Sequence, residues 1–572
     1  MLKQIDNANQ FLKGLRQQYW TGQAYDLMHD ELSSILLVKW YAEKNDLDFS
    51  TSTFNELFTT AQKFFNIDLK VGPVDSRLHS VVRTLSEYKI RGNAEISHQM
   101  HQAWLKKTHR KELGQYFTPP FIRRFMMEIY KPSHTDVVCD PAAGSGAFLI
   151  EAANAMSHFR PSNFMYFDID RLGAVPTAEK AFLMYEHPKT GASLDGVTMK
   201  QCDSLAEQWS TSPDRIYTNV PFGLNITNRE ILNKFEVSAG KKSQISQLLF
   251  IEKCLRELKE GGTFATVVDR GVASNLGLRK ERSILSRMAH LELVVELPGV
   301  AFEYFAGTTF GTFLLFFTKT RSLERKRTMF TKVSNIGYDG KGYSHNNDVS
   351  MPRSFDPVNM QSSWENSDFR VAVDHFRDDK LDSVCSTEVA ETGDWLYGSY
   401  KFRGTAGDRL KDLAVLSNIQ WDGSNILNPT VNRKYRMVEE THLNPSKKSN
   451  SLVLHSILFS RLLSETQEPA CGVVDSRFQG AGVTSENYVI VPKNGVAMTR
   501  IWHAINFNKE AGEYLRAISR GQGRGRIKEE DLMNLPIPPV QSHDKIASII
   551  DLVHTKAETD QRLSQKLETL NN

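Results

Sequence analysis

The chain has 572 residues, too many for one ordinary hydrophobic core, so we expect two to four domains. Its content of 40% hydrophobic and 24% charged residues is typical of a globular protein, and we expect no membrane span and no export leader. The formal net charge of +3 excludes a polycation, so any nucleic-acid contact must come from local patches. The five cysteines lie far apart without a CxxC pair, which argues against disulfides and a metal site and favours a cytoplasmic location.

Residues 1–108 are predicted to form a helical N-terminal domain. Within 25–46 the apolar residues Leu32, Ile35, Leu36 and Trp40 recur at helical spacing, and strand-like alternation is missing from this part of the sequence. We expect a bundle that packs on its neighbour, without an active-site role.

Short β-branched runs alternate with helical segments from about residue 109 to residue 320. The expected strands are 136–141, 163–170, 196–203, 215–222, 263–269, 291–298 and 309–318. This alternation predicts an α/β fold with a mostly parallel sheet and helices on both faces. Because the last two strands follow one another closely, we expect them to form an antiparallel pair at one edge.

The remainder of the chain is predicted to hold a connector, a second globular region and a terminal helix. Residues 321–385 are polar and irregular, and we expect 351–385 to be the connector. The region 386–540 mixes aromatic and basic residues, as a separate domain would. In 541–572 near-heptad spacing predicts a helix that forms a short coiled coil, with Ile546, Ile549, Val553, Leu563, Leu567 and Leu570 as its apolar positions.

A glycine-rich turn, Asp140-Pro-Ala-Ala-Gly-Ser-Gly, follows the first expected strand. Gly144 and Gly146 allow a tight turn into a helix and a close approach of the backbone to a ligand. In open parallel sheets, ligands bind beyond the carboxyl ends of the strands. The candidate cofactor-binding residues here are Asp140, Pro141, Ala142, Gly144 and Gly146, although such a turn alone is equally consistent with a purely structural role.

Acidic residues also end the second and third expected strands. Asp168 follows the glycine-rich turn by about 25 residues, where a carboxylate can accept hydrogen bonds from both hydroxyls of a ribose. Asp203 ends the third strand, where a carboxylate can accept a proton from an adenine amino group. Each acid singly could cap its strand, but three acids ending three successive strands favour a cofactor cleft.

The fourth expected strand ends in Asn219-Val220-Pro221-Phe222. Here the sequence resembles the amino-methylating DNA methyltransferases, whose motif is Asn or Asp, Pro, Pro and an aromatic residue. The amino group of adenine is a poor nucleophile because its lone pair is delocalised into the ring. Acceptors on the Asn219 side chain and the carbonyl of Val220 favour a nucleophilic nitrogen, and the ring of Phe222 would stack on a flipped base. Val220 departs from the motif and removes the stiffness of the usual proline.

The segment from Gly114 through Tyr116, Phe117, Thr118 and Pro119 resembles the element that precedes the first strand in type I methylation subunits. In those proteins it lies against the methionine end of the cofactor, and the resemblance carries this role to Thr118, with Tyr116 beside it. A polar turn before a helix would also explain the prolines. The order of this segment, the glycine-rich turn, the acids and the Asn219 motif matches the subgroup in full.

The resemblance implies a Rossmann-like class I methyltransferase domain over residues 109–350 that uses S-adenosylmethionine to methylate the N6 of adenine. Residues 386–540 resemble half of a specificity subunit, that is, an α+β target-recognition domain, and 541–572 resemble its spacer helix. The implied setting is a restriction-modification or phage-defence system. The implied partners are double-stranded DNA, a second copy or a specificity subunit bound through the terminal helix, and a separate nuclease subunit.

Two other functions stay open at this point. Val220 could mark a catalytically weakened DNA-binding or assembly subunit that keeps the fold. Protein glutamine methyltransferases also use an Asn-Pro-Pro-aromatic motif on a planar nitrogen, although the predicted target-recognition domain favours DNA.

Overall fold

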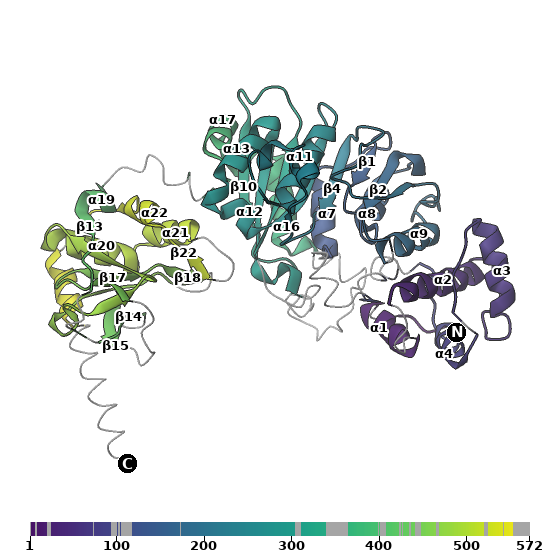
Figure 1. Cartoon of the computed structure of the whole chain (residues 1–572), viewed down its shortest axis with the longest axis horizontal. Helices are drawn as coiled ribbons and strands as arrows, with labels where there is room; N and C mark the ends of the chain where they lie inside the picture. The colour runs from purple at the N-terminus through teal and green to yellow at the C-terminus, as the bar shows by residue number, and fades with distance from the viewer. Residues whose placement is uncertain are drawn as a thin grey trace, which may run out of the picture. The chain divides into compact units, whose positions relative to one another are not determined.

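We describe the chain from a computed structural model. It describes residues 2–5, 8–19, 25–72, 74–92, 96, 100, 103–104, 117–171, 173–303, 311–338, 364–397, 400, 408–421, 425, 427–433, 436–440, 448–464, 468–519, 524–540 and 543–552. The chain divides into two compact units, Met1–Trp395 and Leu396–Asn572 (Figure 1). None of the helices among these described residues is long and apolar enough to cross a membrane.

A nine-stranded sheet forms the centre of the first unit, in the order β11-β10-β8-β9-β7-β4-β1-β2-β3. Its strands are β1 (Val138–Asp140), β2 (Phe164–Asp168), β3 (Thr198–Gln201), β4 (Arg215–Asn219), β7 (Thr263–Asp269), β8 (His290–Leu297), β9 (Thr312–Thr318), β10 (Arg327–Lys332) and β11 (Asp382–Cys385). Strands β3, β2, β1, β4 and β7 are parallel, and β9 is antiparallel to both β7 and β8. The predicted mostly parallel α/β sheet is therefore confirmed, but the antiparallel pair does not form an edge, because β10 and β11 extend the sheet beyond β8.

Helices cover both faces of this sheet. One layer holds α7 (Pro120–Ile129), α8 (Ala147–Ala155), α9 (Ala174–Met184) and α16 (Asp368–Arg377); the other holds α11 (Ser246–Glu257), α13 (Arg279–Met288) and α17 (Ser386–Thr392). Neighbouring side chains of β9 show why both faces are buried. The ring of Phe316 packs on Phe125 of α7, whereas that of Phe317 packs on Trp395 behind the opposite face.

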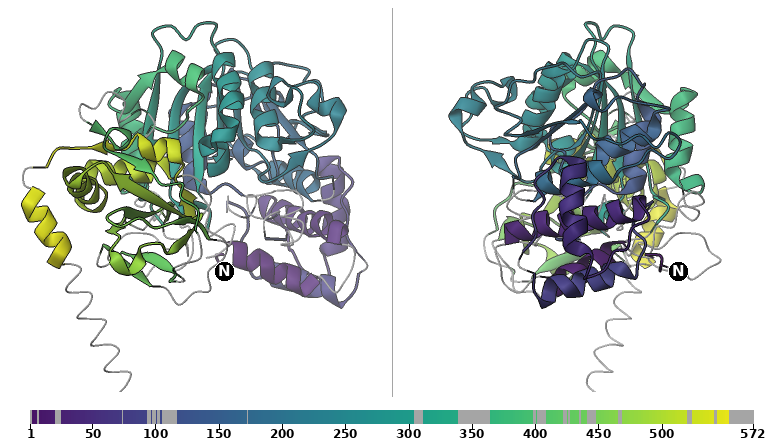
Figure 2. Two further views of the ribbon diagram at one scale, coloured as in Figure 1. Left: turned by 60° about the vertical axis from the view of Figure 1, so that its left-hand side comes forward. Right: turned by 90° about the vertical axis from the view of Figure 1, so that its right-hand side faces the viewer.

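The N-terminal part of the first unit is helical, as predicted: α1 (Ala8–Tyr19), α2 (Tyr25–Lys44), α3 (Phe54–Phe65) and α4 (Ser76–Ser86). Figure 2 shows this purple helical layer beside the blue part of the sheet domain, and within the first unit α2 contacts α9. The buried Lys180 of α9 pairs with Asp30 of α2 at 2.7 Å, and Arg91 pairs with Glu186 at 2.9 Å. These ion pairs and the shared apolar core join the helical layer to the sheet domain.

The end of the expected connector belongs to the first unit, so the division lies later than the sequence indicates. Residues 382–385 form β11, and α17 packs on α13. After α17, the buried Trp395 donates a hydrogen bond from Nε1 to Ser286 Oγ at 2.8 Å. Asp394 is held by both Nε and Nη2 of Arg279 at 3.1 and 3.0 Å. The first unit therefore ends at Trp395 rather than at 385, while residues 351–363 lie outside the described residues.

The second unit is an α+β arrangement around a four-stranded antiparallel sheet in the order β13-β21-β17-β19. Its strands are β12 (Asp408–Arg409), β13 (Ala414–Leu416), β14 (Pro429–Asn432), β15 (Met437–Glu440), β16 (Lys448–Ser451), β17 (Ile457–Ser460), β18 (Leu462–Ser464), β19 (Cys471–Val473), β20 (Gly482–Thr484), β21 (Asn487–Pro492), β22 (Arg524–Arg526) and β23 (Pro536–Ile537). Its helices are α19 (Leu410–Leu413), α20 (Gly495–Phe507), α21 (Lys509–Ile518) and α22 (Glu529–Met533). Along β17, Ile457 and Phe459 pack with the helices, and Leu458 packs on the opposite face, so the sheet lies between two cores.

A further helix lies near the end of this unit and packs on its core. Residues 543–552 are helical, with Ile546 and Ile550 buried and Ile549 exposed, and residues 553–572 lie outside the described residues. The predicted coiled coil therefore stays a prediction.

Candidate active site

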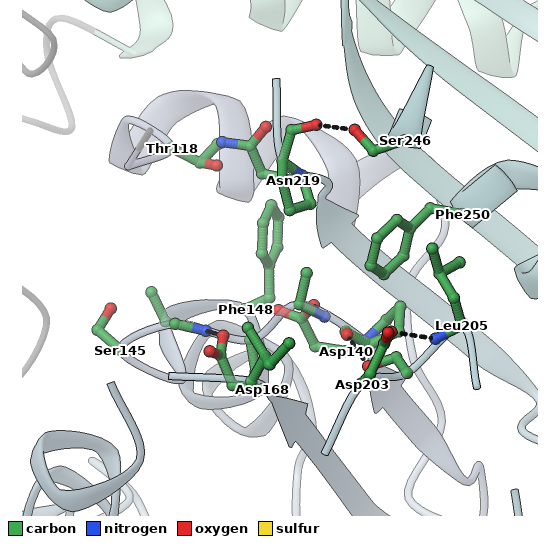
Figure 3. Close-up of a pocket in the computed structure, with 18 of the residues that line it drawn as sticks. Thr118, Asp140, Ser145, Phe148, Asp168, Asp203, Leu205, Asn219, Ser246 and Phe250 are labelled. Atoms are coloured by element: carbon green, nitrogen blue, oxygen red, sulfur yellow. Dashed lines mark hydrogen bonds between the residues drawn. The ribbon is translucent and has the colours of Figure 1, made fainter. Parts of the chain in front are cut away.

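A cavity opens at the carboxyl ends of β1, β2 and β4, where an open parallel sheet binds its ligands. Figure 3 shows the side chains that converge on it from the strand ends and from the neighbouring helices. The lining residues are Phe117, Thr118, Arg123, Asp140, Pro141, Ala142, Ala143, Gly144, Ser145, Ala147, Phe148, Asp168, Ile169, Cys202, Asp203, Ser204, Leu205, Asn219, Pro221, Leu224, Ile226, Ser246 and Phe250. Most of the candidate residues expected from the sequence thus lie around one cavity.

Asp140 ends β1 at the floor of this cavity. One carboxylate oxygen accepts a hydrogen bond from the backbone N–H of Ala142 at 3.1 Å, which folds the turn back on the strand end. Burial raises the pKa of Asp140 to about 7, although the Ala142 N–H opposes the shift. A cationic ligand would favour the ionised form and reverse this shift, so Asp140 is suited to receive a positive group.

The two glycines of the turn have different roles. Both adopt positive φ, +52° at Gly144 and +75° at Gly146, which disfavours any other residue at either position. A Cβ on Gly144 would meet nothing within 4 Å, and Gly144 lines the cavity. A Cβ on Gly146 would lie 2.5 Å from the ring of Phe182, and Gly146 does not line the cavity. Gly146 is therefore required by helix packing and not by contact with a ligand.

Asp168 ends β2 on the opposite side of the glycine-rich turn. Its carboxylate accepts hydrogen bonds from the backbone N–H groups of Gly144 and Asp170, each at 2.8 Å. Burial raises the pKa of Asp168 to about 6. Asp203 follows β3 and accepts the N–H of Leu205 at 3.0 Å. All three acids proposed from the sequence line the same cavity.

The Asn219 motif is divided between the cavity and the core. Asn219 and Pro221 line the cavity, whereas Val220 and Phe222 are only 1% and 7% exposed and do not line it. Phe222 belongs to the apolar core of the first unit, and its expected stacking on a flipped base stays a prediction.

Ser246, the first residue of α11, holds the same turn. Its Oγ donates a hydrogen bond to the carbonyl of Pro221 at 2.8 Å, and its backbone N–H donates to the carbonyl of Leu224 at 2.9 Å (Figure 3). The short pair β5 (Asn225–Ile226) and β6 (Gln244–Ile245) continues this contact. The strand end is thereby fixed despite the missing proline at position 220.

The Thr118 segment lies on the same side of the cavity as Asn219 and across it from Asp140 and Asp168 (Figure 3). Phe117 and Thr118 line the cavity, and the carbonyl of Thr118 accepts a hydrogen bond from Arg123 Nη1 at 2.6 Å. Pro120 begins α7 directly after this turn, in keeping with the preference of proline for the first helical turn. Tyr116 lies outside the described residues.

Sequence reasoning did not identify several lining residues, including Arg123, Phe148, Ser246 and Phe250. They belong to helices α7, α8 and α11, whose first turns lie next to the strand ends. In the sequence, these residues are marked only by their position shortly after an expected strand or turn. That position does not show which side chains of a helix face the cavity.

The part of the chain that forms this cavity is similar to known proteins. Residues 102–367 match the sequence model of the N-6 DNA methylase family. The chain is 31% identical over 222 residues to the type I restriction enzyme EcoKI methylase subunit of Escherichia coli K12, a match that covers 36% of this chain and 40% of that protein. It is 27% identical over 217 residues to the EcoEI methylase subunit of Escherichia coli, with 36% and 42% covered. The chain thus spans about two-fifths of the length of these curated relatives.

Among solved structures, a putative class I S-adenosylmethionine-dependent methyltransferase from Listeria monocytogenes aligns with a TM-score of 0.39 and 15% identity, over 63% of this chain and 98% of that one.

The sheet order and the cavity, together with the family match, define an S-adenosylmethionine-dependent methyltransferase domain of class I. Within this class, residues 102–367 match the sequence model of the N-6 DNA methylase family, and the chain is similar to the methylase subunits of type I restriction enzymes. The fold class, the family resemblance and the cofactor expected from the sequence are thereby confirmed. The specificity half expected in the second unit stays a prediction.

Proposed function

We propose that this chain is a site-specific DNA methyltransferase that transfers a methyl group from S-adenosylmethionine to the N6 of a flipped adenine, within a restriction-modification or phage-defence system. The observation that supports this most directly is the convergence of Thr118, Asp140, Asp168 and Asn219 on one cavity at the carboxyl edge of the sheet.

The residues around the cavity fit the cofactor. S-adenosylmethionine carries an ammonium group and a sulfonium group, and three carboxylates line the cavity. Asp140 would hold the ammonium group, Asp168 the ribose hydroxyls and Asp203 the adenine amino group of the cofactor, with Thr118 at its methionine end. When bound, the cofactor supplies an electrophilic methyl group.

The chain's own contribution to the reaction would be to position the target amine. The side chain of Asn219 and the carbonyl of Val220 would accept hydrogen bonds from the two amine protons and direct the nitrogen lone pair at the methyl group. Ser246 would keep these acceptors in place through the carbonyl of Pro221. This role is one of positioning, which accounts for most of the rate in a displacement between two bound groups.

The second unit, 396–572, would recognise the DNA sequence, and the terminal helix would join a second copy or a specificity subunit. Several basic residues lie between positions 516 and 528 and could contact phosphates. They are weak support, because Arg516 pairs with Glu468 and Arg526 pairs with Glu486. DNA cleavage would require a separate nuclease subunit. All five cysteines are free thiols, in keeping with a cytoplasmic protein.

Sequencing of modified adenine in genomic DNA tests the proposal. Cells carrying the wild-type gene are compared with cells carrying Asn219→Ala, and with cells lacking the gene. We expect N6-methyladenine at one recurring sequence in the wild type alone. An unmodified genome in all three strains would instead favour the weakened subunit suggested by Val220, and methylated glutamine in cellular protein would favour the protein methyltransferase.

A further inference from the structure

The side chains around the cavity include more acidic than basic groups. Asp140, Asp168 and Asp203 are acidic, and Arg123 is the only cationic side chain among the described residues that line the cavity. A ligand that fills this cavity therefore meets three carboxylates and one guanidinium.

Arg123 lies on α7, five residues after Thr118. It is 5% exposed, so its charge is almost wholly removed from water. Its Nη1 donates to the carbonyl of Thr118 at 2.6 Å, and its Nε lies 3.7 Å from Oε2 of Glu151 on α8. A guanidinium carries five N–H donors, so one arginine can bind more than one acceptor at the same time.

The methionine end of S-adenosylmethionine is a zwitterion that brings an ammonium group and an α-carboxylate into the cavity together. The three acids suit the positive groups and the ribose, and they would repel the α-carboxylate. The planar fork of an arginine matches a carboxylate with two parallel hydrogen bonds.

We propose that Arg123 binds the α-carboxylate of S-adenosylmethionine and at the same time fixes Thr118 beside it. This inference rests on the proposed function and adds a cofactor-binding residue to it. The cavity would thereby select a donor that retains its carboxylate.

Isothermal titration calorimetry with the full-length protein tests this inference, with S-adenosylmethionine and decarboxylated S-adenosylmethionine as the two ligands. They differ only in the carboxylate. We expect the wild type to prefer S-adenosylmethionine by roughly tenfold to a hundredfold, the usual effect of a hydrogen-bonded charged group. In Arg123→Gln this preference should fall to about twofold or less, with little change for the decarboxylated ligand.

The matched control is Arg124→Gln, because Arg124 is the next residue of α7, stacks on Trp364 at 4.3 Å and does not line the cavity. This variant should keep the wild-type preference. Should Arg123→Gln fail to fold, Arg123→Lys keeps the charge without the fork and should reduce the preference in part.

Three results would overturn the inference. One is a wild-type protein that binds both ligands equally, and another is an Arg123→Gln protein that keeps the full preference. The third is an equal loss of affinity for both ligands in Arg123→Gln, which would show that Arg123 acts only through Thr118. A wild-type protein that binds neither ligand would contradict the proposed function itself. The experiment therefore distinguishes a wrong role for Arg123 from a wrong proposed function.

Discussion

The two glycines of the turn after β1 allow a matched test of what the turn is for. Both have positive φ, so an alanine at either position costs about 1–2 kcal/mol of backbone strain. Gly146→Ala also places its Cβ 2.5 Å from the ring of Phe182, which is only 2% exposed and packed on all sides. Such overpacking adds about 1–3 kcal/mol.

We therefore expect a loss of about 2–5 kcal/mol of stability in Gly146→Ala and about 1–2 kcal/mol in Gly144→Ala. Thermal unfolding of the two purified variants measures the difference, and the fall in Tm should be about 1.5 to 4 times as large for Gly146→Ala. Calorimetric titration with S-adenosylmethionine, below both unfolding temperatures, should give the opposite order, because only Gly144 lines the cavity. Equal falls in Tm, or a larger loss of cofactor affinity in Gly146→Ala, would refute this division of roles.

Three further predictions follow from individual contacts. Ser246→Ala removes one hydrogen bond to the turn after Asn219, which is worth about 0.5–1.5 kcal/mol. The kcat for DNA methylation should therefore fall roughly 2- to 13-fold, while the Kd for the cofactor stays unchanged. A change in the cofactor Kd alone would contradict the positioning role. Because burial raises the pKa values of Asp140 and Asp168 to about 7 and about 6, both carboxylates become protonated in the free protein below these values. Cofactor binding needs the ionised forms, so affinity measured by titration should fall as the pH is lowered from about 8 to about 5.5, and a flat profile would argue against these contacts. Gly393→Ala would place a Cβ 2.0 Å from a backbone carbonyl oxygen of α13, so it should lower the Tm of the first unit strongly; a wild-type Tm would show that residues after 385 do not belong to that unit.

The sequence predicted the parts of the fold that depend on local signals. The strands β1, β2 and β4 are short, largely buried segments, and they end in Asp140, Asp168 and Asn219, which line the cavity. Because the carboxyl ends of neighbouring parallel strands lie at one edge of a sheet, the convergence of these residues followed from their order alone.

The parts that were not predicted depend on contacts between residues far apart in the chain. Strand β10 buries only Thr328 and Phe330, and β11 is polar, so neither shows the apolar run typical of a central strand. Their positions are determined by pairing with β8 and with each other. The burial of Phe222 and the contact of Ser246 with Pro221 likewise depend on the packing of α11 against the end of β4. The spacing of these residues in the sequence does not indicate that they are close in space.

The central claim is that this cavity brings a methyl donor to an adenine amine held by Asn219. Purified protein incubated with radiolabelled S-adenosylmethionine and unmethylated double-stranded DNA, followed by digestion to nucleosides and chromatography, tests it most directly. We predict that the label appears in N6-methyl-2′-deoxyadenosine from the DNA with the wild type and is lost with Asn219→Ala, while both proteins bind the donor equally. Label in another base or in protein, or transfer that persists without Asn219, would contradict the account.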